Sequence, residues 1–492
     1  MRLSGFASGL DIDAMVKELM KAKRSSYDTM IKNRTKVEWQ QEDYRSISTK
    51  IVDFRNNKLS AFNLSNAMSA KTSEVSGDTA ALTVNSTSPT ALGSLDVRVD
   101  EVAKAANTVF KFSGGTTNGG ADKTLSELGF DITGDNVAVI EINNVIITAN
   151  GSDTLSTLAK QINAVSGSVK ATALYDANSG SFSITSSKTG ATELDTNGAT
   201  VNGLAVSGFS ATNATETFTD GKNAKVQING IEYNQANNRF VVGGIDFTVK
   251  AKTAANSSTA IATTQDTNKT IETIKSFVTE YNNLINSINT ELSEARNRSF
   301  APLTSEEKKE MSDKEIEQWE AKARSGTLRN DSTLSQLVSD LRTTVTSLVG
   351  GIVDGNGKKL SIGITTGGYT EKGKLVLDET KLRTALESSP SEVTALFMGN
   401  TGVFSKMSKS SMTALNTLSK KAGTSLVSTD INASFKDNST LSTQIRNMKT
   451  RESSLLTRLD RMEEQYYKQF SAMESAINKY NSQSSSLGSF YS

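Results

Sequence analysis

The chain has 492 residues, and its 54 basic and 53 acidic side chains leave a net charge of +1. Roughly 150 residues per domain suggests about three domains, and the balanced charge gives no reason to expect nucleic acid or an anionic membrane as a partner. The sequence has no His and no Cys. This absence excludes Ser-His-Asp and Cys-His nucleophiles, imidazole and thiolate metal sites, and disulfides, so an enzyme is disfavoured although carboxylates, Lys and Tyr could still act.

The sequence also lacks two targeting features. No stretch approaches the roughly 18 apolar residues of a membrane span, and we expect no membrane partner. Met1–Leu10 has neither the apolar segment nor the cleavage site of a secretory signal. If the protein leaves the cell, we therefore expect export by another route.

Helical periodicity extends from about Ile12 to Leu59, and Asp11 stands where an N-cap is needed. Apolar residues recur at spacings of three and four, which is typical of a coiled coil. The first turns place four of them on one face: Ile12, Met15, Val16 and Leu19. Bases outnumber acids by 11 to 6 between Lys17 and Lys58, but the two signs are interleaved, as on an ordinary solvated helix.

The pattern changes to β near residue 75. Alternating segments predict a first β domain over residues 76–112 and 221–262, with an Asn229-Gly230 hairpin. Residues 113–220 form an inserted outer β domain with 11 acids and 4 bases. This insert contains a loose loop at Gly114, Gly115, Gly119 and Gly120, and a helix over Thr154–Val165 capped by Ser152 or Asp153.

Helical periodicity returns at about Lys269. An apolar stripe from Ile271 to Leu292 and another from Leu334 to Leu348 predict two helices within a helical domain over residues 263–440. Charged helices are expected over Ser305–Ala323, and a short strand at 375–377 precedes a helix near Glu379–Leu386.

The last 52 residues, 441–492, carry the most regular pattern. Apolar residues recur at alternating spacings of three and four, with Glu452 as an interruption. This seam is too apolar to be left in water and needs a partner helix; the first helical segment, within residues 1–75, is the natural partner in the chain. The predicted fold is therefore α+β and multidomain, with N- and C-terminal helices paired into a coiled-coil leg and two mainly β domains inserted between them.

Motifs for small ligands fail on inspection. Gly351 precedes Gly357 by six residues, where a phosphate-binding loop needs five, and Lys359 stands where Ser or Thr is required. The acidic loops at Asp131–Asp135 and Asp354 lack the ligand spacing of a calcium loop. We predict no catalytic residue, no cofactor and no metal.

Several stretches together carry a family resemblance. They are SGFASGLDID at 4–13, the Ile-Asn pairs at 142–143, 162–163 and 228–229, APLT at 301–304, GTLRND at 326–331 and YYKQFSAMESAINKY from 466. In this order, and over essentially the whole chain, they resemble the hook-associated protein 2 family of flagellar filament caps, and the Ile-Asn stretches look like hook IN repeats. Ser25-Ser26 stands where family members often have Pro, a departure that affects only the local turn.

The resemblance implies a secreted protein at the distal tip of the bacterial flagellar filament. It implies a homo-oligomeric ring, a pentamer in the family, that retains exported flagellin and promotes its folding and polymerisation. Further implied partners are the hook–filament junction protein before filament growth and an export chaperone on the tail from Leu441 to Tyr480, with export through the flagellar type III channel. The terminal helices would be legs that contact flagellin or another copy, and the β domains a plate.

The residues expected at these leg contacts are apolar residues of the two terminal helices: Ile12, Met15, Leu19, Ile47, Ile51, Phe54, Leu455, Leu459, Met462, Tyr466, Phe470, Met473, Ile477 and Tyr480.

Three alternatives remain. Another axial protein, a flagellin or a hook–filament junction protein, would share the terminal heptads. An adhesin would use the acidic β domain, and adhesion is also compatible with capping as a secondary role. A carboxylate-only enzyme such as a glycosidase ranks last, because the distance between two acids cannot be seen in sequence.

Overall fold

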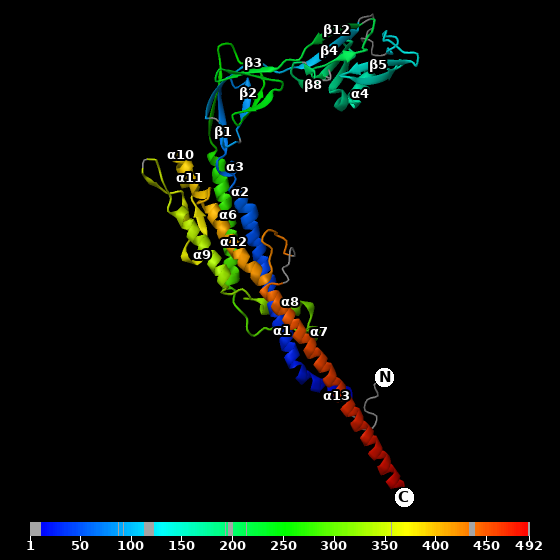
Figure 1. Cartoon of the computed structure of the whole chain (residues 1–492), viewed down its shortest axis with the longest axis vertical. Coiled ribbons are helices and arrows are strands. Elements are labelled where there is room, and N and C mark those ends of the chain that lie inside the picture. The colour runs from blue at the N-terminus through cyan, green and yellow to red at the C-terminus, as the bar shows by residue number, and fades with distance from the viewer. Residues whose placement is uncertain are drawn as a thin grey trace. The chain divides into compact units, whose positions relative to one another are not determined.

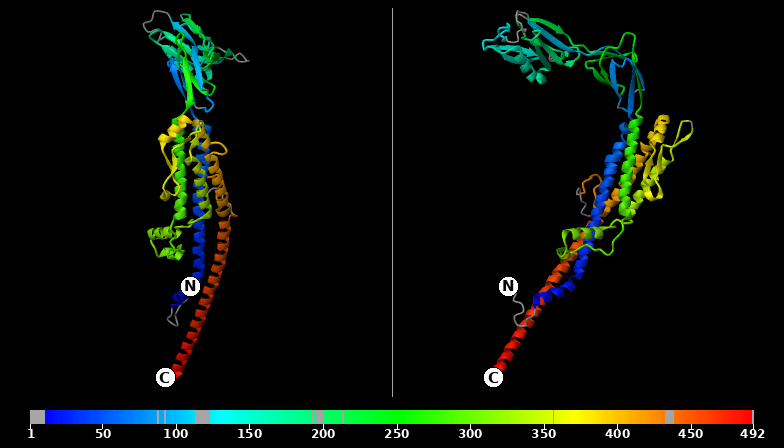
Figure 2. Two further views of the ribbon diagram at one scale, coloured as in Figure 1. Left: turned by 90° about the vertical axis from the view of Figure 1, so that its left-hand side faces the viewer. Right: turned by 180° about the vertical axis from the view of Figure 1, so that it is seen from behind.

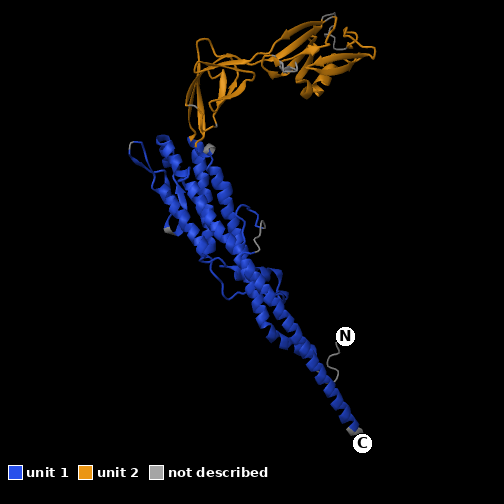
Figure 3. Ribbon diagram, viewed as in Figure 1, with its two compact units in different colours: residues 1–68, 267–492 blue, residues 69–266 orange. Residues whose placement is uncertain are grey.

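The computed structural model describes residues 11–86, 88–91, 93–112, 123–191, 193–194, 200–212, 214–355, 357–431 and 438–490. The chain forms two compact units, residues 1–68 with 267–492 (unit 1) and residues 69–266 (unit 2), shown in Figure 3. The family-like start at Ser4–Leu10 and the loop glycines Gly114, Gly115, Gly119 and Gly120 lie outside the described residues. In the part of the chain that is described, no helix has an apolar stretch long enough to cross a membrane.

Unit 1 consists mainly of helices (Figure 1). Its helices are α1 (Ile12–Val52), the π-helical η1 (Asp53–Leu59), α2 (Ser60–Phe62), α3 (Ser65–Met68), α6 (Thr267–Ser293), α7 (Ser305–Lys309), α8 (Asp313–Arg324), α9 (Ser332–Val349), the 3₁₀ turn η2 (Tyr369–Glu371), α10 (Glu379–Ser388), α11 (Pro390–Phe397), α12 (Val403–Ala422) and α13 (Thr440–Phe490). Its short antiparallel pairs are β18 (Ile352–Val353) with β19 (Lys359–Leu360), and β20 (Ile364–Thr366) with β21 (Leu375–Leu377).

The long helices follow directly from the sequence. None of the 3 prolines lies within α1 or α13, so nothing removes a backbone donor along them. The Asp11 side chain caps α1 by accepting from the Ala14 amide at 2.9 Å, as predicted. The predicted helix to Leu59 is also confirmed, with its last turns π-helical.

One apolar core joins the helices of unit 1. Tyr44, Ile47, Ile51 and Phe54 share this core with residues of α6, α9, α10, α11 and α12. The predicted division between residues 1–75 and the helical domain 263–440 therefore needs correction, because the second half of α1 lies in the body of that domain. Helical periodicity shows which face of a helix is buried but not which segment packs against it. Periodicity alone therefore could not show that the second half of α1 belongs to the helical domain.

Unit 2 is built mainly of antiparallel strands. Its elements are β1 (Lys71–Gly77), β2 (Leu82–Asn85), β3 (Ser94–Glu101), β4 (Ala105–Phe112), β5 (Val137–Ile142), β6 (Val145–Asn150), α4 (Leu155–Ala164), α5 (Ser166–Val169), β7 (Ala171–Asp176), β8 (Ser181–Thr189), β9 (Glu193–Leu194), β10 (Thr200–Asn202), β11 (Val206–Ser207), β12 (Ala214–Thr219), β13 (Ala224–Ile228), β14 (Ile231–Gln235), β15 (Arg239–Val242), β16 (Ile245–Val249) and β17 (Thr259–Gln265).

Two separate apolar cores lie within unit 2. One is formed by the sheets β1-β17-β3-β13-β14 and β15-β16-β2, and the other by the sheets β12-β4-β8-β7 and β11-β5-β6 with α4. Strand β4 contributes Ala106, Phe110 and Phe112 to the second core, so the predicted boundary at 112/113 is misplaced. The boundary at 75/76 also falls inside β1, which pairs with β17 along its whole length.

The asparagines of the Ile-Asn stretches connect separate segments of backbone. Asn163 donates to the Ala173 carbonyl and accepts from the Ala173 amide, both at 2.8 Å. Asn229 accepts from the Asp96 amide at 2.8 Å. A carboxamide supplies a donor and an acceptor together, so Asn163 substitutes for a strand neighbour at the otherwise unpaired backbone of Ala173.

The predicted hairpin at Asn229-Gly230 is confirmed, whereas the predicted cap of the helix over 154–165 is wrong. Asn229 and Gly230 have φ of 48° and 79° and join β13 to β14, as a two-residue hairpin with two left-handed positions requires. The predicted helix over 154–165 is present as α4, but its cap is Thr154, not Ser152 or Asp153. Asp153 instead accepts from the Asn150 amide at 2.9 Å and stabilises the preceding turn.

Candidate functional site

The first turns of α1 pack against the middle of α13, and Figure 2 shows the two helices side by side. This contact, named the leg seam, has four buried residues, Ile12, Val16, Met20 and Leu459. Partly buried side chains surround them: Tyr27, Met462, Tyr466, Tyr467 and Phe470. The seam therefore joins segments more than 400 residues apart in the sequence.

The predicted contact residues fall into four groups. Ile12, Leu459, Met462, Tyr466 and Phe470 lie in the leg seam, whereas Ile47, Ile51 and Phe54 lie in the core of unit 1. Leu455 and Ile477 are half-buried outside both clusters. Met15, Leu19, Met473 and Tyr480 are exposed, at 37%, 42%, 38% and 70%.

The buried face of the first α1 turns differs from the predicted one. The structure buries Ile12, Val16 and Met20, at successive steps of four, and exposes Met15 and Leu19. Residues four apart lie nearly above one another on a helix, so a stripe with this spacing was available in the sequence. Met15 and Leu19 follow Ile12 and Val16 by three residues and so form an alternative apolar face. The position of α13 determines which of the two faces is buried.

Charged side chains hold α1 to α13 above the leg seam. Arg34 Nε donates to Glu452 at 2.7 Å, and Arg34 Nη1 donates to Glu38 at 2.6 Å. Burial acts to lower the pKa of Arg34, but hydrogen bonds to these two carboxylates outweigh it and raise the pKa above its usual value. Glu452, the residue that interrupts the apolar spacing of α13, therefore has a cation partner on α1.

A second set of charge pairs joins α1 to the charged helices α7 and α8. Arg24 pairs with Glu306 at 3.0 Å, and Lys32 pairs with Glu307 at 2.6 Å. Arg324, at the end of α8, donates to Asp43 at 2.6 Å. Each pair is partly exposed and individually weak, but together they fix α7 and α8 along the outer face of α1.

A buried polar network fixes the upper part of α1 to the bundle. Asp331 accepts from Tyr44 Oη at 2.6 Å, from Lys421 Nζ at 2.7 Å and, as the cap of α9, from the Leu334 amide at 3.0 Å. Burial acts to raise the pKa of Asp331, but these three hydrogen bonds outweigh it and hold the pKa below its usual value. No sequence pattern marks this network, because its members are separated by up to 377 positions.

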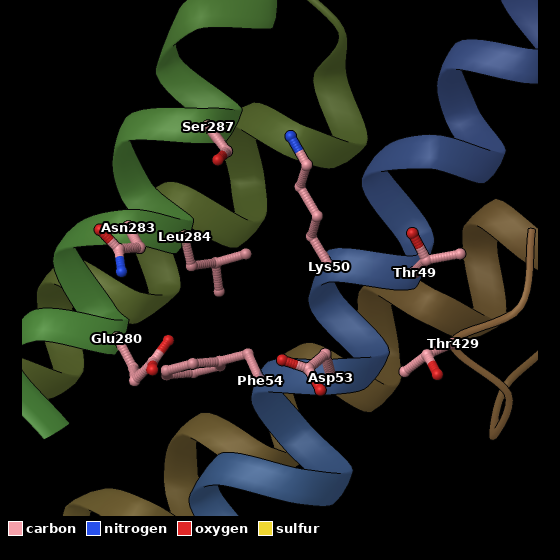
Figure 4. Close-up of a pocket in the computed structure, with 9 residues that line it drawn as sticks. All are labelled: Thr49, Lys50, Asp53, Phe54, Glu280, Asn283, Leu284, Ser287 and Thr429. Atoms are coloured by element: carbon pink, nitrogen blue, oxygen red, sulfur yellow. The ribbon is translucent and has the colours of Figure 1, made fainter. Parts of the chain in front are cut away.

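A cavity of about 350 Å³ lies beside η1 between α1 and α6 (Figure 4). Phe54 and Leu284 form its apolar part, and Lys50, Asp53 and Glu280 bring mixed charges. Glu280 is already paired with Lys58 on η1 at 3.0 Å, so the cavity favours neither a cation nor an anion. Among the described residues, no group of three or more carboxylates is placed to hold a metal ion.

Comparison with known proteins identifies the family of the chain. The model of the flagellar hook-associated protein 2 C-terminus matches residues 221–482, and the model of the N-terminus of the same protein matches residues 8–106. Flagellar hook-associated protein 2 of Halalkalibacterium halodurans is 27% identical over 550 aligned positions that cover 100% of both chains.

Two further relatives share less with the chain. The protein of the same name from Thermotoga maritima is 28% identical over 278 positions, 54% of this chain and 41% of the relative. A crystal structure of the flagellar cap protein from Escherichia coli covers 83% of this chain and 99% of its own, with 19% identity and a TM-score of 0.49. Since the C-terminal family model alone matches more than half of the sequence, the resemblance is confirmed and the chain belongs to the flagellar hook-associated protein 2 family.

Proposed function

We propose that this protein caps the distal end of the growing flagellar filament as a homo-oligomeric ring, and that α1 and α13 form legs that contact flagellin. Family membership supports a place on the flagellum. The observation that carries the leg assignment is that the apolar spacing of α13 continues past the leg seam. Met473 and Tyr480 are exposed there, and an apolar helix face of this kind needs a partner.

The chemistry of the leg suits contacts that form and break. Its seam contains Met20, Met462 and three tyrosines; methionine adapts to different surroundings, and tyrosine presents an apolar ring with a polar end. A ring that retains arriving flagellin and releases it into the filament needs contacts of this kind. Under the same proposal, the exposed end of α13 binds an export chaperone before secretion, and the ring first meets the hook–filament junction protein.

A matched set of α13 variants tests the leg assignment in motile cells. We expect Leu459→Asp and Phe470→Asp to abolish filament growth while flagellin accumulates in the medium, because a buried carboxylate separates the two helices. Ser471→Asp, on the exposed side of the same helix, serves as the control and leaves filaments intact. Normal filaments in both seam variants would exclude the leg assignment.

The oligomeric state separates a cap from other axial proteins. Light scattering on the full chain and on a chain ending at residue 470 would show a small discrete oligomer that depends on the last residues of α13. Open-ended fibres would instead indicate a flagellin-like protein. Equal chaperone binding by the shortened chain would exclude the chaperone assignment.

A further inference from the structure

A cavity of about 630 Å³ lies in unit 1 between α1, α8, α13 and the segment that follows α6. Apolar side chains line part of it, from Val37 on α1, Phe300 in the segment and Met448 on α13. Three cations, Lys36, Arg296 and Arg298, also line it. Its volume lies within the range of roughly 300–1,000 Å³ typical of sites that bind small molecules or side chains.

All the charged side chains that line this cavity are basic. Its lining contains no acidic residue, and among the described residues none of Lys36, Arg296 and Arg298 forms an ion pair. Other cations on the same elements are paired, as Arg34 is with Glu452 and Arg324 with Asp43. Three uncompensated positive charges beside an apolar surface therefore favour an occupant with negative charge.

The wall that carries two of these cations is held in place by the turn after α8. Glu294 accepts from the Gly326 amide at 2.6 Å, and Asn297 donates to Ser325 Oγ at 3.2 Å. Gly326 has φ +70°, and a Cβ there would lie 3.0 Å from Arg296 Cα. The close approach of the two backbones thus depends on glycine, and it fixes the backbone from which the exposed side chains of Arg296 and Arg298 extend.

We propose that this cavity binds an acidic segment of a protein partner, with an apolar side chain against Phe300 and Met448 and carboxylates at the three cations. Peptide is favoured over nucleic acid by two features. The exposed carboxamides of Asn33 and Gln444 on the rim are suited to backbone groups, and the net charge of the whole chain is only +1. This inference is independent of capping, because it rests on the cavity alone.

Binding can be followed on the full chain through its own fluorescence. Phe300 lies edge-to-face on Trp319, with ring centroids 4.7 Å apart, so an occupant that contacts Phe300 changes the emission of Trp319. A Trp39→Phe background leaves Trp319 as the single reporter, since the chain has 2 tryptophans. The probe is the peptide acetyl-Glu-Phe-Glu-Leu-Glu-amide, compared with acetyl-Lys-Phe-Lys-Leu-Lys-amide and with penta-uridylate.

We expect saturable binding of the acidic peptide that weakens as salt is raised, and none of the basic peptide. Arg296→Glu with Arg298→Glu should weaken binding by at least about tenfold, and so should Lys36→Glu, which alters α1 instead of the segment. The control, Lys309→Glu with Lys314→Glu, changes the same net charge at exposed positions outside the cavity. Far-ultraviolet circular dichroism shows whether every variant is folded.

Three results would overturn the inference. The first is no saturable change with the acidic peptide, and the second is equal weakening in the cavity and control variants, which would indicate attraction to net charge alone. The third is tighter binding of penta-uridylate than of peptide, displaced by the same variants, which would assign the cavity to nucleic acid.

Discussion

Replacing Asp331 with Ala tests whether the buried network holds α1 to the helical bundle. The substitution removes the acceptor for Tyr44 and Lys421 and the cap of α9 at once. Tyr44 is only 1% exposed, so solvent cannot readily replace Asp331 as the acceptor for its hydroxyl. The Lys421 side chain is 35% exposed and keeps access to solvent.

The cost can be worked from these three contacts. A lost N-cap costs about 1 kcal/mol, and a buried hydroxyl left without its acceptor costs about 1–3 kcal/mol. The partly exposed pair with Lys421 contributes about 0–1 kcal/mol. We therefore expect Asp331→Ala to lower the free energy of unfolding of unit 1 by about 3 kcal/mol, and Asp331→Asn to cost about half as much, because Asn also caps helices.

Urea unfolding followed by tryptophan fluorescence measures this cost in the correct part of the chain. Trp39 and Trp319 both lie in unit 1, so the signal reports that unit. Glu317→Ala, at an exposed position on α8, should change the free energy of unfolding by no more than about 0.5 kcal/mol. If Asp331→Ala differs from this control by less than about 1 kcal/mol, the network does not stabilise the bundle.

The same residue gives a pH dependence with a defined sign. The pKa of Asp331 is lower in the folded protein than in the unfolded chain, so the unfolded chain binds the proton more readily. Its contribution to stability is fully present above the unfolded pKa, about 3.9, and is lost as the pH falls through the lower folded value. Between neutral pH and pH values below about 4, the free energy of unfolding should therefore decrease less in Asp331→Asn than in the unmodified protein.

Three further predictions concern other parts of the chain. Glu452→Leu should change stability by less than about 1 kcal/mol, whereas Arg34→Ala, which leaves the nearly buried Glu452 unpaired, should cost about 2–3 kcal/mol in the same urea assay. Gly351→Ala should lower the free energy of unfolding by more than about 1 kcal/mol, because φ is +73° and the new Cβ would lie 2.2 Å from a backbone oxygen. Gly230→Ala should lower it by less, because the space around Gly230 is open. Asn163→Ala should lower the melting temperature of unit 2 by calorimetry, because two partly buried hydrogen bonds from the Asn163 side chain to the Ala173 backbone are lost.

Sequence periodicity predicted the helices whose buried face is made of large apolar residues. The predicted stripe of α9 is buried at all six of its apolar positions, which are Leu334, Leu337, Val338, Leu341, Val345 and Leu348. The prediction missed α12 (Val403–Ala422), whose buried face includes Ser411, Ala414 and Ser419. Phe404, Met407, Leu415 and Leu418 lie on the same face at helical spacing, so the sequence carried a local signal for this helix, but Ser411 and Ser419 interrupt the apolar stripe.

The pairing of the terminal helices was predictable, but its geometry was not. The apolar spacing of α13 required a partner, and the sequence offered one candidate of matching length and spacing. Which stripe of α1 faces α13 depends on contacts such as Arg34 with Glu452, separated by 418 positions. An apolar pattern in the sequence shows that one face of a helix must be buried. It does not show which side chains of another segment pack against that face.

The density of buried contacts along α13 decreases toward its C-terminal end. Near its start, Leu441 lies in the core of unit 1. Further along, Glu452 is held by a charge pair, and among the residues of α13 whose burial is described Leu459 is the last buried one. Beyond Phe470 the helix exposes Met473 and Tyr480. Resistance to local opening follows the density of buried contacts, so it falls continuously from the bundle to the tip. Under the proposed function, a leg of this kind keeps its base fixed at the leg seam, where Leu459 meets the first turns of α1, while its exposed tip exchanges partners.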